Sequence, residues 1–216
     1  MNAHELTRPK LFQQHTPAAI YSEAECLAFW TQHLKPTVVD TFLSRKYSIP
    51  EISNRITELQ ALLLERFGTL HVNIYTGYVV QDERILATCS ITNGLPIMAI
   101  VIPAAMDLFK KMHAERPGEQ RELFNLMLGV TMIHEMEHAA YGYIGTNTAL
   151  PLTLSERVNF EKRTWALTCE QSLSPLVEKH HKVLPPGLIE FYEHWVKAGR
   201  NVESPLWAEF IRDVHR

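Results

Sequence analysis

The segment His134–His138, with the sequence HEMEH, constrains this chain most, because it lies inside a long apolar stretch from Leu123 to Tyr143. Two histidines four residues apart on a helix lie on one face, one turn above the other, so their imidazoles can converge on a single metal ion. Glu135 then points toward the open position of that metal and can accept a proton from a bound water. The pattern therefore predicts a helix that carries a hydrolytic metal centre.

Apolar side chains surround almost the whole predicted helix, which is typical of a buried central helix. They are Leu123, Phe124, Leu126, Met127, Leu128, Val130, Met132, Ile133 and Met136. An unpaired buried polar or charged group costs several kcal/mol, so the two histidines and two glutamates of the segment need partners. A metal ion would satisfy three of them at once. The alternative is that the histidines are core residues satisfied by ordinary hydrogen bonds.

Length and composition are those of an ordinary globular protein. The 216 residues, 46% hydrophobic and 21% charged, predict one domain with a substantial core. A net charge of −3 gives no general attraction to nucleic acid or to an anionic membrane, and we expect neither as a partner. Residues 1–16 lack a signal-peptide pattern and no later stretch resembles a membrane span, so we expect a cytoplasmic protein. Cys26, Cys89 and Cys169 form no C-x-x-C pair and are expected to be reduced thiols.

The first third of the chain has the signals of two helices. A capping box of Ser22 and Glu25 begins a predicted helix that runs to about Leu34 and ends at Pro36. A second helix is predicted over 51–67, because a glycine follows it directly.

Three strands are predicted next, over 72–80, 85–91 and 95–102, because these stretches are rich in β-branched and aromatic residues. Asn93-Gly94 is a strong signal for a two-residue hairpin between the second and third strands. Pro96 and Pro103 indicate either an edge position or the ends of the third strand.

Helices return in the second half of the chain. They are predicted over 104–114, 119–143, 155–173, 188–198 and 205–214. The second of these carries the HEMEH segment. Pro175 is expected to end the third.

Catalytic zinc usually takes three protein ligands and a water, so the two histidines leave one ligand to be found. The pattern H-E-x-x-H-x-x-G-x-x-H fails, because Tyr141 replaces its glycine and Ile144 its third histidine. Glu137 lies off the ligand face, where a salt bridge or a supporting contact is expected. The chain has only four aspartates, none of them between the motif and the helix that follows it: Asp40, Asp82, Asp107 and Asp213.

The helix after the motif offers three glutamates: Glu156, Glu161 and Glu170. Glu161 falls on the more apolar side of that helix, whereas the other two fall on its charged side. Glu156 also has a role in a capping box with Thr153. We therefore expect Glu161 to be the third ligand, with Glu156 left as the alternative. An i, i+4 ion pair with Arg157 is the other role open to Glu161.

His134-Glu135-x-x-His138, followed 23 residues later by Glu161 on a second helix, resembles the gluzincin branch of the zincin metallopeptidases. In that family a twisted sheet, whose edge strand pairs with substrate, packs on the active-site helix, and a glutamate helix follows. The resemblance implies an α+β, zincin-like fold in a single domain. Its parts would be a helical extension over 1–70, a metallopeptidase core over 71–175 and C-terminal helices over 176–216.

The resemblance also implies roles for individual residues. His134, His138 and Glu161 would hold Zn²⁺, and Glu135 would act as general base in the hydrolysis of a peptide or protein substrate. Family members commonly add a Tyr or His donor for the oxyanion, and spacing does not choose among Tyr141, Tyr143, His180, His181 and His194. The alternative function is a regulatory module on a zincin scaffold, either non-catalytic or specific for one partner.

Overall fold

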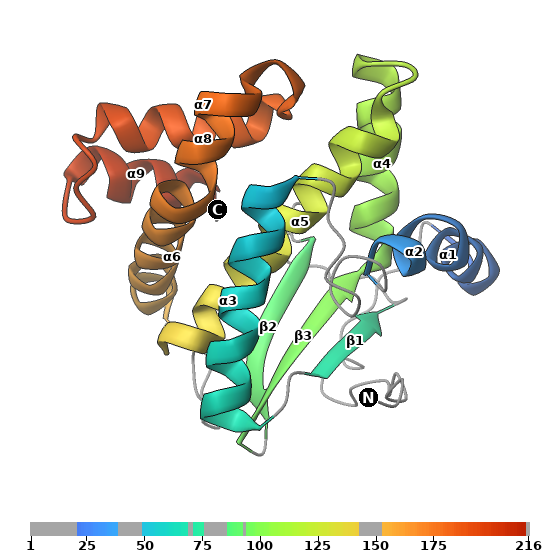
Figure 1. Cartoon of the computed structure of the whole chain (residues 1–216), viewed down its shortest axis with the longest axis horizontal. Coiled ribbons are helices and arrows are strands. Elements are labelled where there is room, and N and C mark those ends of the chain that lie inside the picture. Colours follow the sequence, from blue (N-terminus) through green and yellow to red (C-terminus); the bar gives the residue numbers. More distant parts are fainter. Residues whose placement is uncertain are drawn as a thin grey trace.

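Helices make up most of this computed structural model, and a small sheet completes an α+β architecture (Figure 1). The structure describes residues 21–38, 49–68, 71–75, 86–92, 94–142 and 153–214. The α-helices are α1 (Glu23–Phe29), α2 (Lys35–Val38), α3 (Pro50–Phe67), α4 (Ile102–Glu115), α5 (Gln120–Tyr141), α6 (Leu154–Thr168), α7 (Ser174–His180), α8 (Pro186–Lys197) and α9 (Pro205–Val214). Two π-helical stretches, Trp30–Leu34 and Cys169–Leu173, and a 3₁₀ turn, His181–Val183, lie between them.

The sheet contains β1 (His71–Tyr75), β2 (Ala87–Thr92) and β3 (Leu95–Val101) in the order β1-β3-β2. Strand β1 is parallel to β3, whereas β2 is antiparallel to it with Thr92 opposite Leu95. Gly94 has a φ of 76°, which glycine adopts without strain. The predicted hairpin between the second and third strands is therefore confirmed. Residues 76–80 of the first predicted strand lie outside the described residues.

The central strand carries the two prolines that the sequence left ambiguous. Because β3 lies between β1 and β2, the edge interpretation is wrong. Pro96 is the second residue of β3, and Pro103 lies in the first turn of α4, where a missing N–H costs no helical hydrogen bond. The prolines thus mark the ends of the strand.

Helix α5, which carries the HEMEH segment, is the centre of the structure. It packs against α3, α4, α6 and the strands β2 and β3. Fourteen of its 22 residues are buried, so it is the predicted central helix. It ends at Gly142, in the left-handed conformation, as α3 ends at Gly68.

Two helical segments continue past prolines that were expected to end them. Pro36 lies inside α2 and Pro175 inside α7, so both predicted endings are wrong. In each case a five-residue π-helical stretch comes directly before. The Lys35 N–H binds the Trp30 carbonyl and the Ser174 N–H binds that of Cys169, five residues back. These wider turns accommodate the proline ring without breaking the helix.

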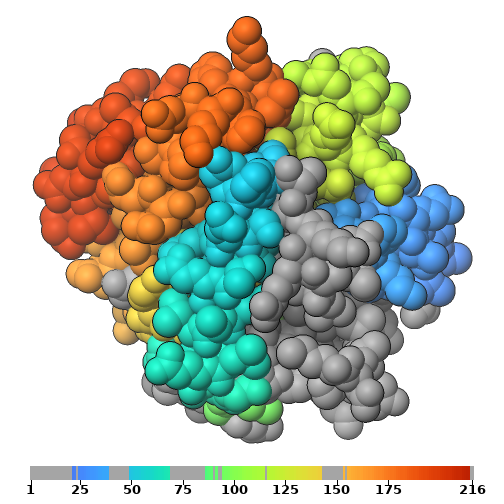
Figure 2. All heavy atoms as spheres, in the orientation of Figure 1, coloured from blue at the N-terminus to red at the C-terminus, as the bar shows by residue number. Residues whose placement is uncertain are grey.

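One cluster of buried hydrophobic side chains extends from Tyr21, before the first helix, to Ile211 in the last. Helix α3 runs across the middle of one face of the molecule, with the C-terminal helices beside it (Figure 2). Cys26, Cys89 and Cys169 are thiols outside any disulfide, as predicted. Within the described ranges, every helix is too short or too polar to cross a bilayer.

Candidate metal centre

Three side chains converge between α5 and α6. His134 and His138 extend from α5, one turn apart, and Glu161 faces them from α6. The Nε2 atoms of the histidines lie 3.1 Å apart, and Glu161 Oε2 lies 3.1 Å from His134 Nε2 and 3.5 Å from His138 Nε2. The structure therefore brings together the three residues that were expected to be ligands.

The spacing of these three atoms suits a zinc ion. A tetrahedral ion with bonds of about 2.0–2.1 Å holds its ligand atoms about 3.3–3.4 Å apart. The measured separations of 3.1, 3.1 and 3.5 Å bracket this value. Two imidazoles and one carboxylate also form the ligand set of a catalytic zinc site of the His₂Glu type. The residues present thus fit the metal in both distance and chemistry.

Hydrogen bonding fixes which nitrogen of His134 carries the proton. Its Nδ1 lies 3.2 Å from Thr168 Oγ1, while the Thr168 hydroxyl lies 2.6 Å from Glu137 Oε2 and donates to it. The same hydroxyl also lies 3.0 Å from the Thr164 carbonyl, so two oxygen acceptors compete for its proton and Thr168 accepts from His134 Nδ1–H. The Nε2 atom then carries the lone pair that faces Glu161.

His138 is oriented in the same way by a second threonine. Its Nδ1 lies 3.0 Å from Thr164 Oγ1, whose hydroxyl donates to the Phe160 carbonyl at 3.1 Å. Thr164 and Thr168 lie one turn apart on α6, and both are buried. One face of α6 therefore sets the tautomer of both imidazoles, which is the usual requirement for histidine ligands.

The carboxyl groups at the site differ in their protonation. Burial acts to raise the pKa of Glu161, but hydrogen bonds from His134 and His138 outweigh it when an imidazole proton lies on Nε2, as in a site without metal, so the pKa is well below its ordinary value. Burial raises the pKa of Glu135 to about 8, assisted by the Glu161 charge and opposed by His138 and the backbone N–H of Cys89. A divalent cation beside Glu135 would lower this pKa, because it favours the carboxylate.

Glu137 forms the salt bridge that was expected for it. Its partner is Arg55 on α3, whose Nε and Nη2 donate to Oε1 at 3.1 and 2.8 Å. Burial acts to lower the pKa of Arg55, but the Glu137 contacts outweigh it and raise the pKa. Arg55 was not among the predicted site residues, although the sequence contains a signal for it. The arginine falls on the apolar stripe of α3, among Ile52, Ile56, Leu59 and Leu63.

The two other glutamates of the following helix have separate partners. Glu156 is exposed and completes the predicted capping box with Thr153, its Oε2 lying 2.9 Å from the Thr153 nitrogen. Glu170 accepts from Trp195 Nε1 at 2.6 Å. Only Glu161 of the three is placed within reach of the histidines.

The proposed oxyanion donors are not gathered around the ligands. His180 lies 3.3 Å from Glu51 Oε2, His194 stacks on Phe210 at 4.0 Å, and His181 is exposed. The Tyr141 hydroxyl lies 3.4 Å from Arg55 Nη2, beside the buried ion pair. Tyr143 lies outside the described residues. The described contacts therefore select no donor.

An aromatic stack supports the site from the C-terminal side. Trp165 of α6 stacks on the His134 ring at 4.1 Å between centroids, and its ring also stacks on Phe191 of α8 at 4.0 Å. The sequence did not predict this contact. The stack restricts rotation of the imidazole in addition to the Thr168 hydrogen bond.

Comparison of the chain with protein-family models, with curated proteins and with solved structures finds no match. The function is therefore inferred from the chemistry of the site. That chemistry is a buried pair of imidazoles, a carboxylate bound to them and a second buried carboxyl group, Glu135, next to the first histidine.

Proposed function

We propose that this protein is a zinc-dependent metallopeptidase of the gluzincin type, which hydrolyses peptide bonds in a peptide or protein. One observation carries the proposal: His134 Nε2, His138 Nε2 and Glu161 Oε2 lie at the mutual spacing that a tetrahedral ion requires. These three residues would hold Zn²⁺. When bound, the ion would supply a Lewis acid that activates water and polarises the scissile carbonyl.

Glu135 is the residue that moves protons in this proposal. Its carboxylate accepts a proton from the attacking water and transfers it to the leaving amine, as general acid–base catalysis requires. Its burial supports this role, because a carboxylate removed from bulk solvent is a stronger base than an exposed one. A site that only stabilised the fold would need no such base.

The position of β2 supports a role in substrate binding. Among the described strands β2 lies at one edge of the sheet, and the backbone N–H of Cys89 hydrogen-bonds to Glu135. The gluzincin resemblance implies that substrate pairs with an edge strand beside the active-site helix. We infer that β2 is that strand in this protein.

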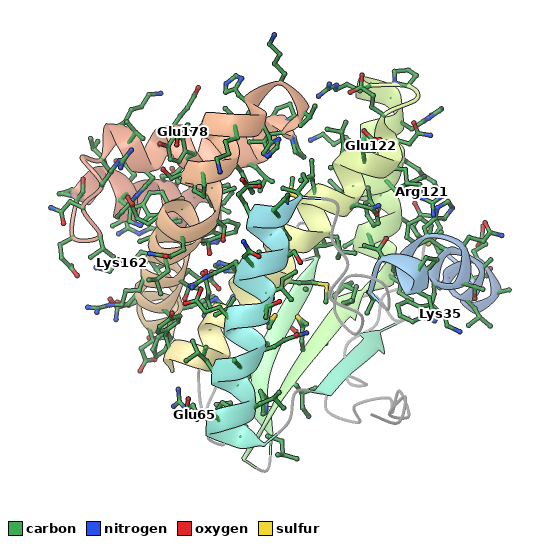
Figure 3. The ribbon with its side chains drawn as sticks, in the orientation of Figure 1. Lys35, Glu65, Arg121, Glu122, Lys162 and Glu178 are labelled. Atoms are coloured by element: carbon green, nitrogen blue, oxygen red, sulfur yellow. The ribbon has the colours of Figure 1, made fainter. Side chains whose placement is uncertain are left out.

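The test is the substitution Glu135→Gln, which keeps the shape of the side chain but removes its basicity. We expect one zinc per chain and unchanged folding, whereas kcat/KM on a peptide library falls by at least about 10²-fold. Glu122→Gln is the matched control, because Glu122 lies exposed in the first turn of the same helix (Figure 3).

Two results would contradict the proposal. The first is hydrolysis by Glu135→Gln at the rate of the native chain. The second is a zinc-loaded native chain that cleaves neither the library nor any protein captured by Glu135→Gln. The latter result would favour a non-catalytic regulatory module.

A further inference from the structure

A buried ion pair lies directly behind the candidate metal centre. The side chain of Arg55 is 4% exposed and that of Glu137 is fully buried. Burying two charges is expensive, and such a pair is often no more stabilising than apolar residues of similar volume. The position of this pair therefore calls for an explanation beyond stability.

The pair is connected to His134 by an unbroken series of hydrogen bonds. Two Arg55 donors occupy Oε1 of Glu137, and the Thr168 hydroxyl occupies Oε2 at 2.6 Å. Thr168 in turn accepts from His134 Nδ1–H at 3.2 Å. The Thr168 hydroxyl also lies 3.0 Å from the Thr164 carbonyl, but its contact with Glu137 is the shorter one. Glu137 is therefore linked to the imidazole through this hydroxyl.

The hydrogen bonds behind the second histidine lead to a neutral group. His138 Nδ1 is bound by Thr164, whose hydroxyl donates to a neutral backbone carbonyl, that of Phe160. The two histidines thus have the same tautomer but differ in what lies behind them. A carboxylate behind a ligating imidazole raises its basicity and hence its affinity for metal.

We propose that Glu137, held by Arg55, is a positioning residue that acts through Thr168 to strengthen His134 as a metal ligand. This inference rests on the proposed function only in requiring that His134 bind zinc. It makes α3 part of the proposed metal site, although the gluzincin resemblance implied that residues 1–70 are an extension.

The experiment measures the Kd for Zn²⁺ of the full chain by competition with a chromophoric chelator. Glu137→Gln is expected to weaken zinc binding by about 10- to 100-fold. T168V, which removes the hydroxyl, should weaken it similarly, and T168S, which keeps the hydroxyl, should restore it. Urea unfolding of the metal-free chains is measured in parallel, so that a loss of folding is distinguished from a loss of affinity.

The decisive measurement is a double-mutant cycle. If Glu137 acts through Thr168, adding E137Q to T168V changes the Kd by no more than about two-fold. In the matched control, E137Q retains its full effect in the T164V background, because Thr164 serves the other histidine. If E137Q does not fold, R55K replaces it in both backgrounds. R55K should also weaken zinc binding, but by less than E137Q, because lysine keeps the positive charge and loses the two-point contact with Glu137.

Two outcomes overturn the inference. One is a Kd for E137Q within about two-fold of the native value. The other is an equal effect of E137Q in the native and T168V backgrounds, which would mean that Glu137 acts on the fold alone. If the native chain binds zinc and E137Q weakens it as expected, but no peptide is cleaved, the proposed peptidase activity fails and this inference stands.

Discussion

At the scale of single residues, two hydroxyl protons determine the chemistry of the site. Thr164 donates to the Phe160 carbonyl and Thr168 to Glu137, so neither has a proton left for an imidazole. When Nδ1 of each histidine donates to its threonine, both Nε2 atoms present lone pairs toward Glu161. This is the tautomer that a histidine ligand requires, and the two threonines of α6 favour it.

The first prediction separates the two glutamates that the sequence left open. Glu161→Gln should weaken zinc binding by at least about 100-fold. Removing a charged ligand costs more zinc affinity than removing a hydrogen-bond partner behind a ligand, which costs about 10- to 100-fold. Zinc should then no longer raise the melting temperature at concentrations that stabilise the native chain, since ligand-linked stabilisation scales with occupancy. Dialysis followed by elemental analysis, together with thermal unfolding in zinc and in chelator, measures both effects.

Glu156→Ala is the companion variant on the same helix. It removes the capping box, so it should lower the melting temperature slightly while zinc content stays that of the native chain. The reverse result, with zinc lost from Glu156→Ala and retained by Glu161→Gln, would contradict the ligand assignment.

At the scale of secondary-structure elements, local signals in the sequence predicted local features. The capping boxes at Ser22 and Thr153, the hairpin before Leu95 and the glycine end of α3 are all present. Each depends on residues within one or two turns of one another. The residues that cause each of these features therefore lie in the same short segment as the feature.

Features that depend on tertiary packing were predicted poorly. Pro36 and Pro175 were expected to end helices because proline lacks the N–H of a helical hydrogen bond. The sequence does not show the π-helical turn that accommodates each proline. Those turns bury Leu34 and Leu173.

The Arg55–Glu137 pair joins residues 82 positions apart, a distance over which helical periodicity gives no information. A buried glutamate predicted that a partner exists, but not which one.

The second prediction concerns the C-terminal end of α5, one turn after His138. Arg66 of α3 donates to the carbonyls of Ala139 and Ala140 at 3.3 and 2.9 Å, where the helix dipole also favours a cation. Arg66→Ala should lower the free energy of unfolding by about 1 kcal/mol. Urea unfolding of the metal-free chain measures this change.

Arg121 provides the matched control for Arg66. Arg121 is exposed in the first turn of α5, where a positive charge opposes the helix dipole (Figure 3). Arg121→Ala should therefore be neutral or slightly stabilising. Equal losses for both variants would show that the charge is not acting on the end of the helix.

At the scale of the whole molecule, α3 connects parts of the chain that are far apart in sequence. Arg55 and Arg66 bind α5, and Glu51 in its first turn binds Lys179 and His180 of α7 at 2.8 and 3.3 Å. One helix thus joins α5 to the C-terminal helices. Contacts at its first turn should influence the stability of the molecule as a whole.

The third prediction tests this connection by pH. The hydrogen bond from Lys179 lowers the pKa of Glu51 from 4.5 to about 2, with smaller contributions from the backbone and His180. Because the folded-state pKa is depressed, the carboxylate stabilises the fold fully above about pH 4.5 and loses this contribution as the pH falls toward 2. By about pH 3 more than half of it should be gone.

The measurement is the free energy of unfolding in urea at several pH values for the native chain and Glu51→Gln. The difference between them should be constant from about pH 7 to pH 5 and should shrink below that, since glutamine does not titrate. Glu65→Gln, which replaces an exposed carboxylate near the other end of α3 (Figure 3), is the matched control. A Glu51→Gln difference that stays constant down to about pH 3 would mean that Lys179 does not hold this carboxylate in its charged form, and that α3 and α7 are joined by apolar packing alone.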